Sequence, residues 1–212
     1  MHGVWQWTVC SAVSRINTYT PLAESTPVDL GLPSGLKWAA GNIGAKNPQD
    51  YGLYFAWGET TGYTAEQVTS GVRSFDAASY TAPEASVIAP TLTLKLEYDA
   101  ARANLGGNWR MPTDNECEEL IDNCDAVWTD DYNGTGVAGC IFTSKINGNS
   151  VFFPAAGYFN GSSVKGVGSS GRNWSALGYK SSHVSYLYLV DWKQGVNSYP
   201  SFYGLPVRGV CE

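Results

Sequence analysis

Tyrosine and serine are concentrated near the C-terminus, in residues 179–203. These 25 residues contain five tyrosines and five serines, together with Trp192 and Phe202. Tyrosine offers a large amphipathic contact area at low entropic cost, and small polar residues adapt their hydrogen bonds, which is the composition of antibody binding sites. In the alternative interpretation, the same aromatic side chains pack the core of a strand-rich protein. Composition alone leaves both interpretations open, and the first makes this stretch a recognition surface.

Catalytic chemistry has weaker candidates. His183 lies close to the serines of residues 181–185, but a serine–histidine pair needs an orienting carboxylate and an oxyanion hole. The sequence marks neither. The acidic residues of 116–119 fall in the first turn of a predicted helix, where carboxylates interact favourably with the helix dipole. Asp130 and Asp131 fall in a predicted loop, and nothing nearby supports a metal there. We therefore expect no catalytic residue and predict that the chain is not an enzyme.

The cysteines and histidines do not have the spacing of a metal site. There are five cysteines at irregular spacing, no CxxC pair and only two histidines, so we expect no metal and no cofactor. Cys117 and Cys124 are seven residues apart on one predicted helix, about 10.5 Å along its axis, which is too far for a disulfide. Buried thiols are therefore favoured over a disulfide framework.

Composition and charge exclude several classes of protein. Hydrophobic residues make up 43% of the 212 residues and charged residues 15%, which is enough apolar material for a core. The net charge is −6 and the 13 lysines and arginines form no cluster, so a nucleic-acid partner has no electrostatic footprint. No stretch approaches the roughly 20 apolar residues of a membrane helix. The start of the chain lacks the basic residues and unbroken apolar run of a signal peptide.

Two helices must position the rest of the chain. Thr113 and Glu116 form a capping-box pattern, and the apolar residues that follow, from Cys117 to Cys124, recur at helical spacing. Residues 96–105 have a weaker helical rhythm that ends at two glycines. We expect short helices in both places.

The other segments indicate strands and ordered loops. Residues 28–38 predict two strands joined by a Gly/Pro turn, and residues 140–153 predict a hairpin that turns at Asn147 and Gly148. The Ser, Thr and Gly-rich residues 58–91 and 160–172 are expected to be loops. Residues 185–192 and 205–211 are the last two predicted strands. The domain organisation is then an N-terminal extension, 1–26, and one domain, 27–212.

The strand at residues 185–192 has a regular alternation. Leu187 and Leu189 must point to one face and Tyr186 and Tyr188 to the other. Because leucine is the natural core residue, we expect the tyrosines to face outward.

Six short motifs occur in order along residues 28–211. They are VDLGLPSGLKW at 28–38, DYGLYFAWGET at 50–60, WRMPT at 109–113, FPAAGY at 153–158, WSA at 174–176 and GLPVR at 204–208. Their order and spacing resemble the Fibrobacter succinogenes major paralogous domain family of gut Bacteroidetes and their phages. That family includes many variable proteins of diversity-generating retroelements, and its members resemble the C-type lectin fold. The resemblance implies an α+β fold with a twisted antiparallel sheet, two short helices and long ordered loops.

The resemblance also implies a function for the C-terminal stretch. A reverse transcriptase would rewrite adenine-bearing codons in a variable region of about 173–205, and the fold would hold that region rigid. Scaffold positions would be Trp174, Ser175, Leu187, Leu189, Gly204, Val207 and Arg208. Ligand-binding variable positions would be Asn173, Leu177, Tyr179, Ser181, Ser182, His183, Tyr186, Tyr188, Asp191, Asn197, Tyr199, Ser201, Phe202 and Tyr203. Trp192 does not fit the adenine pattern and is retained as an anchor. Ser201 stands where the family often has an arginine.

Three functions follow as expectations. The first is a diversified receptor-binding or adhesin protein with a protein or glycan ligand. We expect it to be a monomer, and by resemblance it belongs at a cell surface, in a secreted form or on a phage particle. The second is a surface adhesin or glycan-binding module of the same fold without diversification. The third, an enzyme related to the formylglycine-generating enzyme, is disfavoured because Cys211 has no second cysteine in the preceding 70 residues. A calcium-dependent sugar site is not supported either, since its second motif is absent from the sequence.

Overall fold

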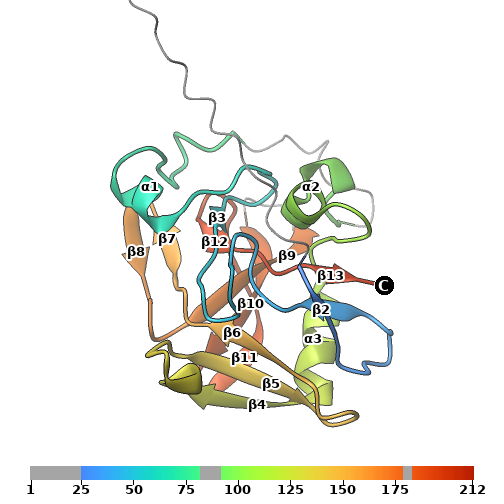
Figure 1. Ribbon diagram of the computed structural model, residues 1–212. Coiled ribbons are helices and arrows are strands. Elements are labelled where there is room, and N and C mark those ends of the chain that lie inside the picture. The colour runs from blue at the N-terminus through green and yellow to red at the C-terminus, as the bar shows by residue number, and fades with distance from the viewer. Residues whose placement is uncertain (1–24, 82–91, 179–182) are drawn as a thin grey trace, which may run out of the picture.

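The computed structural model describes residues 25–81, 92–178 and 183–212. It is a mixed α+β fold in which antiparallel strands form several small sheets and the helices are few (Figure 1). The helices are α1 (Ala65–Thr69), α2 (Ala100–Leu105) and α3 (Asp114–Asn123), with short 3-10 turns at Leu96–Tyr98 and Tyr132–Gly134. The strands are β1 (Pro27–Asp29), β2 (Lys37–Ala39), β3 (Tyr54–Phe55), β4 (Cys124–Thr129), β5 (Gly139–Ser144), β6 (Ser150–Pro154), β7 (Tyr158–Asn160), β8 (Ser163–Lys165), β9 (Gly171–Gly178), β10 (His183–Val190), β11 (Lys193–Pro200), β12 (Leu205–Pro206) and β13 (Val210–Cys211).

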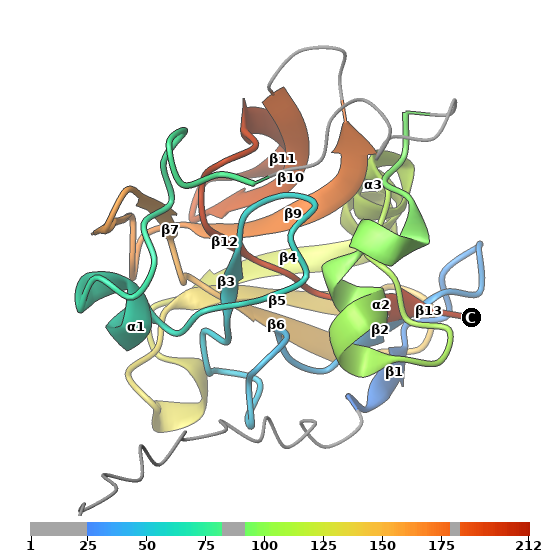
Figure 2. The same cartoon turned by 90° about the horizontal axis from the view of Figure 1, so that it is seen from above.

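Two three-stranded sheets form the centre of the molecule. In one, β10 lies between β9 and β11; in the other, β5 lies between β4 and β6. Figure 2 shows these sheets as separate layers, with α1 and α2 on opposite sides of the molecule. A third three-stranded sheet, in which β1 and β13 flank β2, and two antiparallel pairs, β3 with β12 and β7 with β8, complete the fold.

Helix α3 confirms the strongest local prediction. The Thr113 side chain accepts a hydrogen bond from the Glu116 backbone, and the Glu116 carboxylate accepts one from the Thr113 backbone, which completes the capping box. The helix buries Cys117 and Leu120 and packs against β9, β10 and β11. It ends one residue before Cys124, which begins β4.

Some boundaries differ from the sequence predictions. Residues 58–91 were expected to be loop, yet α1 forms there because Thr64 and Gln67 make a second capping box. Residues 160–172 contain β8 and the start of β9. The last part of the chain contains four strands, β10 to β13, where two were expected. The hairpin at 140–153 is confirmed as β5 and β6, and the pair at 28–38 as β1 and β2. Of the expected extension, residues 1–24 lie outside the described part of the chain.

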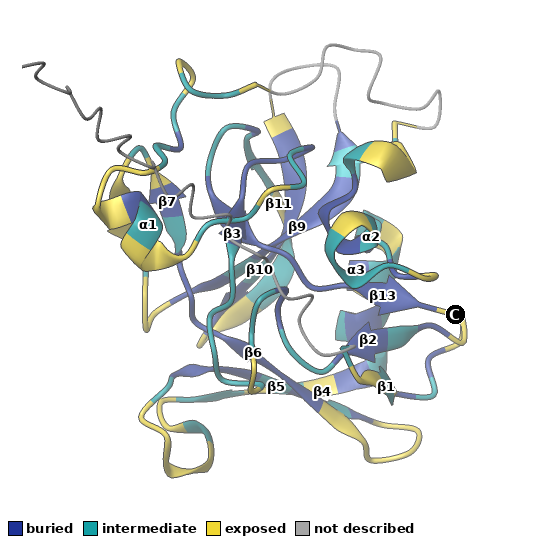
Figure 3. Ribbon diagram, turned by 45° about the horizontal axis from the view of Figure 1, so that its top comes forward, coloured by how far each residue is buried: buried dark blue, intermediate teal, exposed yellow. Residues whose placement is uncertain are grey.

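The core lies on both faces of the β9–β10–β11 sheet. Leu187 and Leu189 belong to one buried cluster with Leu120 of α3. Trp174 and Tyr186 belong to another, with Trp57 and residues of α2. Figure 3 shows that the strands at the centre are mostly buried and that exposure is concentrated at helix surfaces and loops. The sheet is therefore an internal layer over much of its area.

A buried arginine ties the C-terminal strands to the rest of the fold. Arg208 is fully buried, and its guanidinium donates hydrogen bonds to Asn42 Oδ1, the Ala39 carbonyl and the Phe152 carbonyl. It also stacks over Phe153, with its Cζ atom 4.4 Å from the ring centroid. Burial lowers the pKa of Arg208 to about 9, so the group keeps its charge at neutral pH.

The four described cysteines, Cys117, Cys124, Cys140 and Cys211, are buried free thiols, as predicted. Burial raises the pKa of all four, which reduces their reactivity. Among the described residues, no helix has the length and apolar character needed to cross a membrane.

Candidate ligand-binding surface

The register of the β9–β10–β11 sheet places an arginine among the tyrosines. Tyr188 of β10 lies opposite Arg172 of β9 on one side and Gly195 of β11 on the other. Because directly paired residues project to the same face, Arg172 and Tyr188 share a face with Tyr186. The opposite face carries Leu187 and Leu189 and is covered by α3.

Four aromatic rings surround the guanidinium of Arg172. Its Cζ atom lies 4.3 Å from the ring centroid of Tyr158, 5.0 Å from Tyr199, 5.5 Å from Tyr188 and 6.0 Å from Tyr186. All four distances lie within the range of cation–π attraction, about 6 Å. The rings come from β7, β10 and β11, so the arginine joins three strands through one cation.

The rings also pack against one another. Tyr186 stacks on Tyr199 with centroids 4.7 Å apart, and Tyr158 lies 5.1 Å from Tyr199 and 5.5 Å from Tyr203. Asn160 Nδ2 donates a 3.2 Å hydrogen bond to the Tyr203 hydroxyl. We call this cluster the tyrosine surface, and it consists of Tyr158, Arg172, Tyr186, Tyr188, Tyr199 and Tyr203.

The expectation that Tyr186 faces solvent is wrong. It lies on the predicted face of the strand, but only 2% of it is exposed. Its ring is enclosed between Trp174, at 6.3 Å in edge contact, and the stacked ring of Tyr199. The ring of Tyr199, from the neighbouring strand β11, covers Tyr186, so Tyr186 supports the surface from below. Tyr188, Tyr199 and Tyr203 are half-buried and keep accessible edges.

The expectation is also wrong for two further positions, which were predicted to bind ligand but are buried. Asn173 lies opposite Leu187 on the leucine face, and its amide donates to Asn42 Oδ1 at 3.0 Å. Ser201 is 7% exposed, and its carbonyl accepts a hydrogen bond from the Trp57 backbone. Both residues are engaged by the protein itself, which leaves them unsuited to direct ligand contact.

The remaining expected positions fall in different places. Leu177 and Phe202 are half-buried, whereas His183 and Asn197 are exposed. Asp191 and Trp192 form the turn between β10 and β11 and are also exposed. Tyr179, Ser181 and Ser182 lie outside the described residues.

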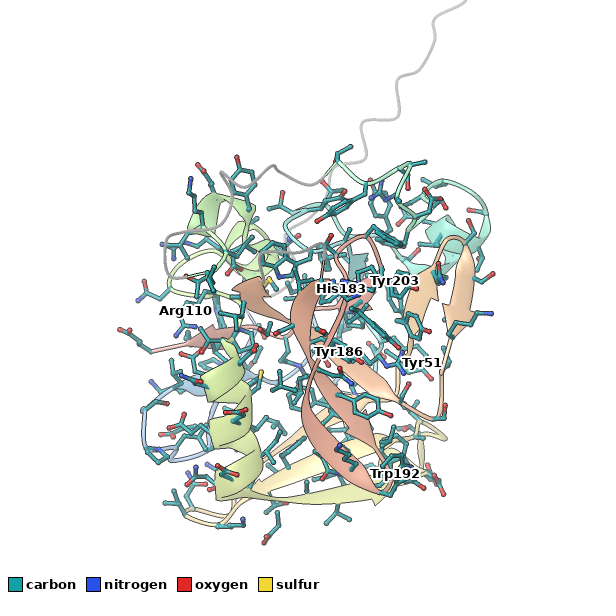
Figure 4. The ribbon with its side chains drawn as sticks, turned by 180° about the vertical axis from the view of Figure 1, so that it is seen from behind. Tyr51, Arg110, His183, Tyr186, Trp192 and Tyr203 are labelled. Atoms are coloured by element: carbon teal, nitrogen blue, oxygen red, sulfur yellow. The ribbon has the colours of Figure 1, made fainter. Side chains whose placement is uncertain are left out.

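The expected positions do not form one continuous patch. His183 and Trp192 lie at opposite ends of β10, and Figure 4 shows Tyr203 near the His183 end. Seven residues of strand separate His183 from Val190, about 23 Å along the strand. Trp192 is 74% exposed, but it belongs to a separate area at the tip of the hairpin.

Two residues of the surface were not among the predicted ones. Arg172 directly precedes the predicted region, and Tyr158 ends the FPAAGY motif. The alternation of β9 contained a signal for Arg172, because it lies two residues before Trp174 and therefore on the same face. Nothing in the local sequence indicates Tyr158, because β7 reaches the surface through tertiary packing.

The surface carries one positive charge and neutral phenols. Burial raises the pKa of Tyr186. Burial also raises the pKa of Tyr199, against the opposing effect of Arg172. These tyrosines are therefore protonated at neutral pH. Among the described residues, no carboxylate forms an ion pair with Arg172.

A hydrogen-bonded frame holds the strands beneath the surface. The Asp114 carboxylate, at the start of α3, accepts hydrogen bonds from the hydroxyls of Ser175 and Ser185. The indole of Trp57 donates to the Ser175 carbonyl at 2.8 Å, and that of Trp174 donates to the Phe55 carbonyl at 2.7 Å. This frame fixes β9 and β10 to α3 and β3.

The polar groups considered for catalysis are not brought together. Ser185 donates its hydroxyl to Asp114 rather than to His183, which is exposed. Glu116 is paired with Arg110 at 2.5 Å. Within the described ranges, no group of three histidine, cysteine or acidic residues could hold a metal ion. Three cavities of about 230, 400 and 200 Å³ lie around Leu105 and Trp109, and none of the three is lined by the tyrosine surface.

Comparison with known proteins gives no relative from which a function could be transferred. No family model, curated protein or solved structure matches the chain.

Proposed function

We propose that this chain is a ligand-binding protein that recognises another molecule through the tyrosine surface. The observation that carries the proposal is the convergence of four tyrosine rings on the single guanidinium of Arg172. Tyrosine and arginine are enriched among the residues that dominate binding energy at interfaces. The rings of Tyr188, Tyr199 and Tyr203 remain half-exposed, so a ligand would bury them further.

Rigidity supports this proposal. The surface rests on a buried sheet held by Trp57, Trp174 and Asp114 rather than on free loops. Side chains that are already ordered lose little conformational entropy when a ligand binds. A binding protein gains affinity from such an arrangement, whereas nothing in it supplies a nucleophile with an activating base.

The finer fold and the diversification remain part of the same proposal. We assign the C-type lectin fold from the sequence resemblance, and the mixed α+β architecture with small antiparallel sheets is compatible with it. The proposed scaffold positions are all buried: Trp174, Ser175, Leu187, Leu189, Gly204, Val207 and Arg208. A protein whose variable residues change between gene copies needs its scaffold residues to be buried, apart from the residues that contact ligand. Asn173, Tyr186 and Ser201 are then excluded from the contacting set.

The DNA around the gene distinguishes a diversified protein from a fixed module of the same fold. A diversified protein has a reverse-transcriptase gene nearby and a near-identical template repeat whose mismatches fall at adenines. A fixed adhesin or glycan-binding module has neither feature, and mismatches at other bases would contradict diversification. The enzyme alternative is disfavoured, because burial raises the pKa of the Cys211 thiol and makes it a poor nucleophile.

Substitution at the surface tests binding itself. Tyr188→Ser removes a half-exposed ring from the tyrosine surface, and we expect at least a tenfold loss of affinity for ligands selected on the wild-type chain. Trp192→Ser is the matched control, since it removes an exposed aromatic side chain from the turn between β10 and β11, which is not part of the tyrosine surface. Biolayer interferometry on both variants measures the difference. Equal loss in both, or loss only in the Trp192 variant, would overturn the assignment of the surface.

A further inference from the structure

The guanidinium of Arg172 is an uncompensated cation. It forms no hydrogen bond or ion pair with the described residues, and its Nε and Nη1 atoms are buried without an acceptor. Three other arginines differ in this respect. Arg73 has Glu59, although its Nε is also buried without a partner; Arg110 has Glu116, and Arg208 has three oxygen acceptors.

Aromatic faces compensate this charge only in part. A ring attracts the cation through its quadrupole, but it offers no lone pair to an N–H group. Buried N–H donors without acceptors are rare in folded proteins, and each one calls for an explanation. Nη2 is not among the buried atoms without a partner, and Arg172 as a whole is half-buried, so we place the approach of an acceptor on the Nη2 side. The rings hold the Arg172 guanidinium in one orientation. Ligand binding therefore costs little additional conformational entropy of this side chain.

We propose, resting on the proposed function, that Arg172 is the anchor for a carboxylate on the surface of a protein partner. A carboxylate at Nη2 accepts a hydrogen bond from the guanidinium and neutralises the charge that the buried Nε and Nη1 share, and such a bond is stronger than one between neutral groups. The surrounding rings exclude water and strengthen the attraction. Tyr188 and Tyr203 then contact the partner around this ion pair.

Charge and shape favour a protein over the other anionic ligands. The chain carries a net charge of −6, which repels a polyanion more strongly than a single carboxylate placed against one cation. The three cavities described above lie elsewhere, around Leu105 and Trp109. Small ligands are usually held in pockets, whereas protein partners bind broad, shallow surfaces. An aspartate or glutamate side chain of a partner protein meets both conditions.

Selection from a phage-displayed library of random 12-residue peptides tests this anchor. The full chain is immobilised, and selected peptides are retained if Tyr188→Ser weakens them. We expect those peptides to be enriched in aspartate or glutamate. Changing the acidic residue to its amide in the peptide, or Arg172→Gln in the protein, should each lower affinity at least tenfold. Making both changes together should lower it little further, because both remove the same ion pair.

The outcomes separate the anchor from the proposed function. The anchor is overturned if the peptides that depend on Tyr188 are not enriched in acidic residues. It is also overturned if the losses of binding free energy from the peptide change and from Arg172→Gln are additive. Either result leaves the binding surface itself intact. If no selected peptide depends on Tyr188, the proposed function itself fails. An array of neutral and acidic glycans provides a further arm. Binding only to acidic glycans, in a manner that depends on Arg172, overturns the assignment of a protein partner.

A folding control keeps the test decisive. Near-UV circular dichroism and thermal unfolding establish whether Arg172→Gln retains the native packing of its tyrosines. If that variant does not fold, the acid-to-amide change is measured on the wild-type chain alone. The Arg172 Nε–H resonance of ¹⁵N-labelled protein should then shift with the acidic peptide and remain unchanged with its amide form. A shift of equal size with both peptides would overturn the ion pair.

Discussion

Leu187 and Tyr186 are neighbours in β10, yet their side chains enter different environments. Leu187 is 1% exposed and packs in the cluster that contains Cys117 and Leu120 of α3. Tyr186 is equally buried, but it lies beneath the half-exposed rings of Tyr188 and Tyr199. The leucine face is closed by α3. The tyrosine face is buried against Trp57 and α2 at Trp174 and Tyr186 and is only half-covered at Tyr188 and Tyr199.

This difference separates stability from recognition within a single sheet. On the leucine face, apolar side chains are removed from water by α3, so their size and shape determine how well the core packs. On the tyrosine face, the accessible ring edges contribute less to folding and remain available to a partner. Substitutions on the two faces should therefore affect different measured quantities.

Leu189→Ala should give the largest effect on stability. Leu189 is fully buried on the leucine face, and truncating a buried leucine costs about 2–5 kcal/mol through lost burial and the cavity that remains. Chemical denaturation measures the free energy of unfolding of the variant. The affinity of its folded fraction for a selected ligand should be unchanged. A large loss of affinity without loss of stability would show that the two faces are not separable.

Part of the acid sensitivity of the fold should belong to α3, on the leucine side. Burial alone would raise the pKa of Glu116, but hydrogen bonds from Arg110 and Thr113 outweigh it and hold the pKa below its usual value. A lowered pKa of an acid gives stability that is present above about pH 4.5 and is lost as the pH falls further. The contribution of such a partly exposed pair is about 0.5–1 kcal/mol.

Glu116→Gln tests this pH dependence. Glutamine also serves in a capping box, so the helix cap is retained while the charge is removed. The variant should be less stable than the wild type at pH 7 and show a smaller loss of stability between pH 5 and pH 3, both measured by urea denaturation. Parallel curves for the two proteins would exclude Glu116 as the group concerned. Ligand affinity should change little between pH 6 and pH 8, because the phenols of Tyr186 and Tyr199 stay protonated there.

The comparison of faces also explains what the sequence could predict. The alternation in β10 is a local property, and it assigned Leu187 and Tyr186 to opposite faces correctly. The capping box at Thr113 is equally local, and α3 begins where it predicts. Local patterns succeed in these cases because hydrogen bonds and side-chain direction within one element do not depend on distant residues.

The burial of particular side chains depends on contacts with distant residues, and the alternation within one strand does not predict these contacts. Tyr186 is covered by Tyr199, which reaches it from the next strand. Asn173 is buried because its partner, Asn42, is 131 residues away in the chain. The environment of Arg172 likewise depends on a distant segment, because Tyr158 of β7 lies over its guanidinium. Which face a residue occupies could be predicted, but which residues cover it could not.

Gly195→Ala should have the smallest effect on stability and is the most direct probe of where a ligand lies. Gly195 is opposite Tyr188 on the tyrosine face, and an added Cβ would have no atom within 4 Å. Replacing glycine in a compatible conformation stabilises a protein by about 0.4–1 kcal/mol through the unfolded state, so thermal unfolding should change little or rise slightly. Gly195→Leu extends the side chain further into the same open space. If a ligand covers Tyr188, affinity should fall progressively from glycine to alanine to leucine while stability is maintained. Unchanged affinity in both variants would place the ligand nearer Tyr203, at the other end of the tyrosine surface.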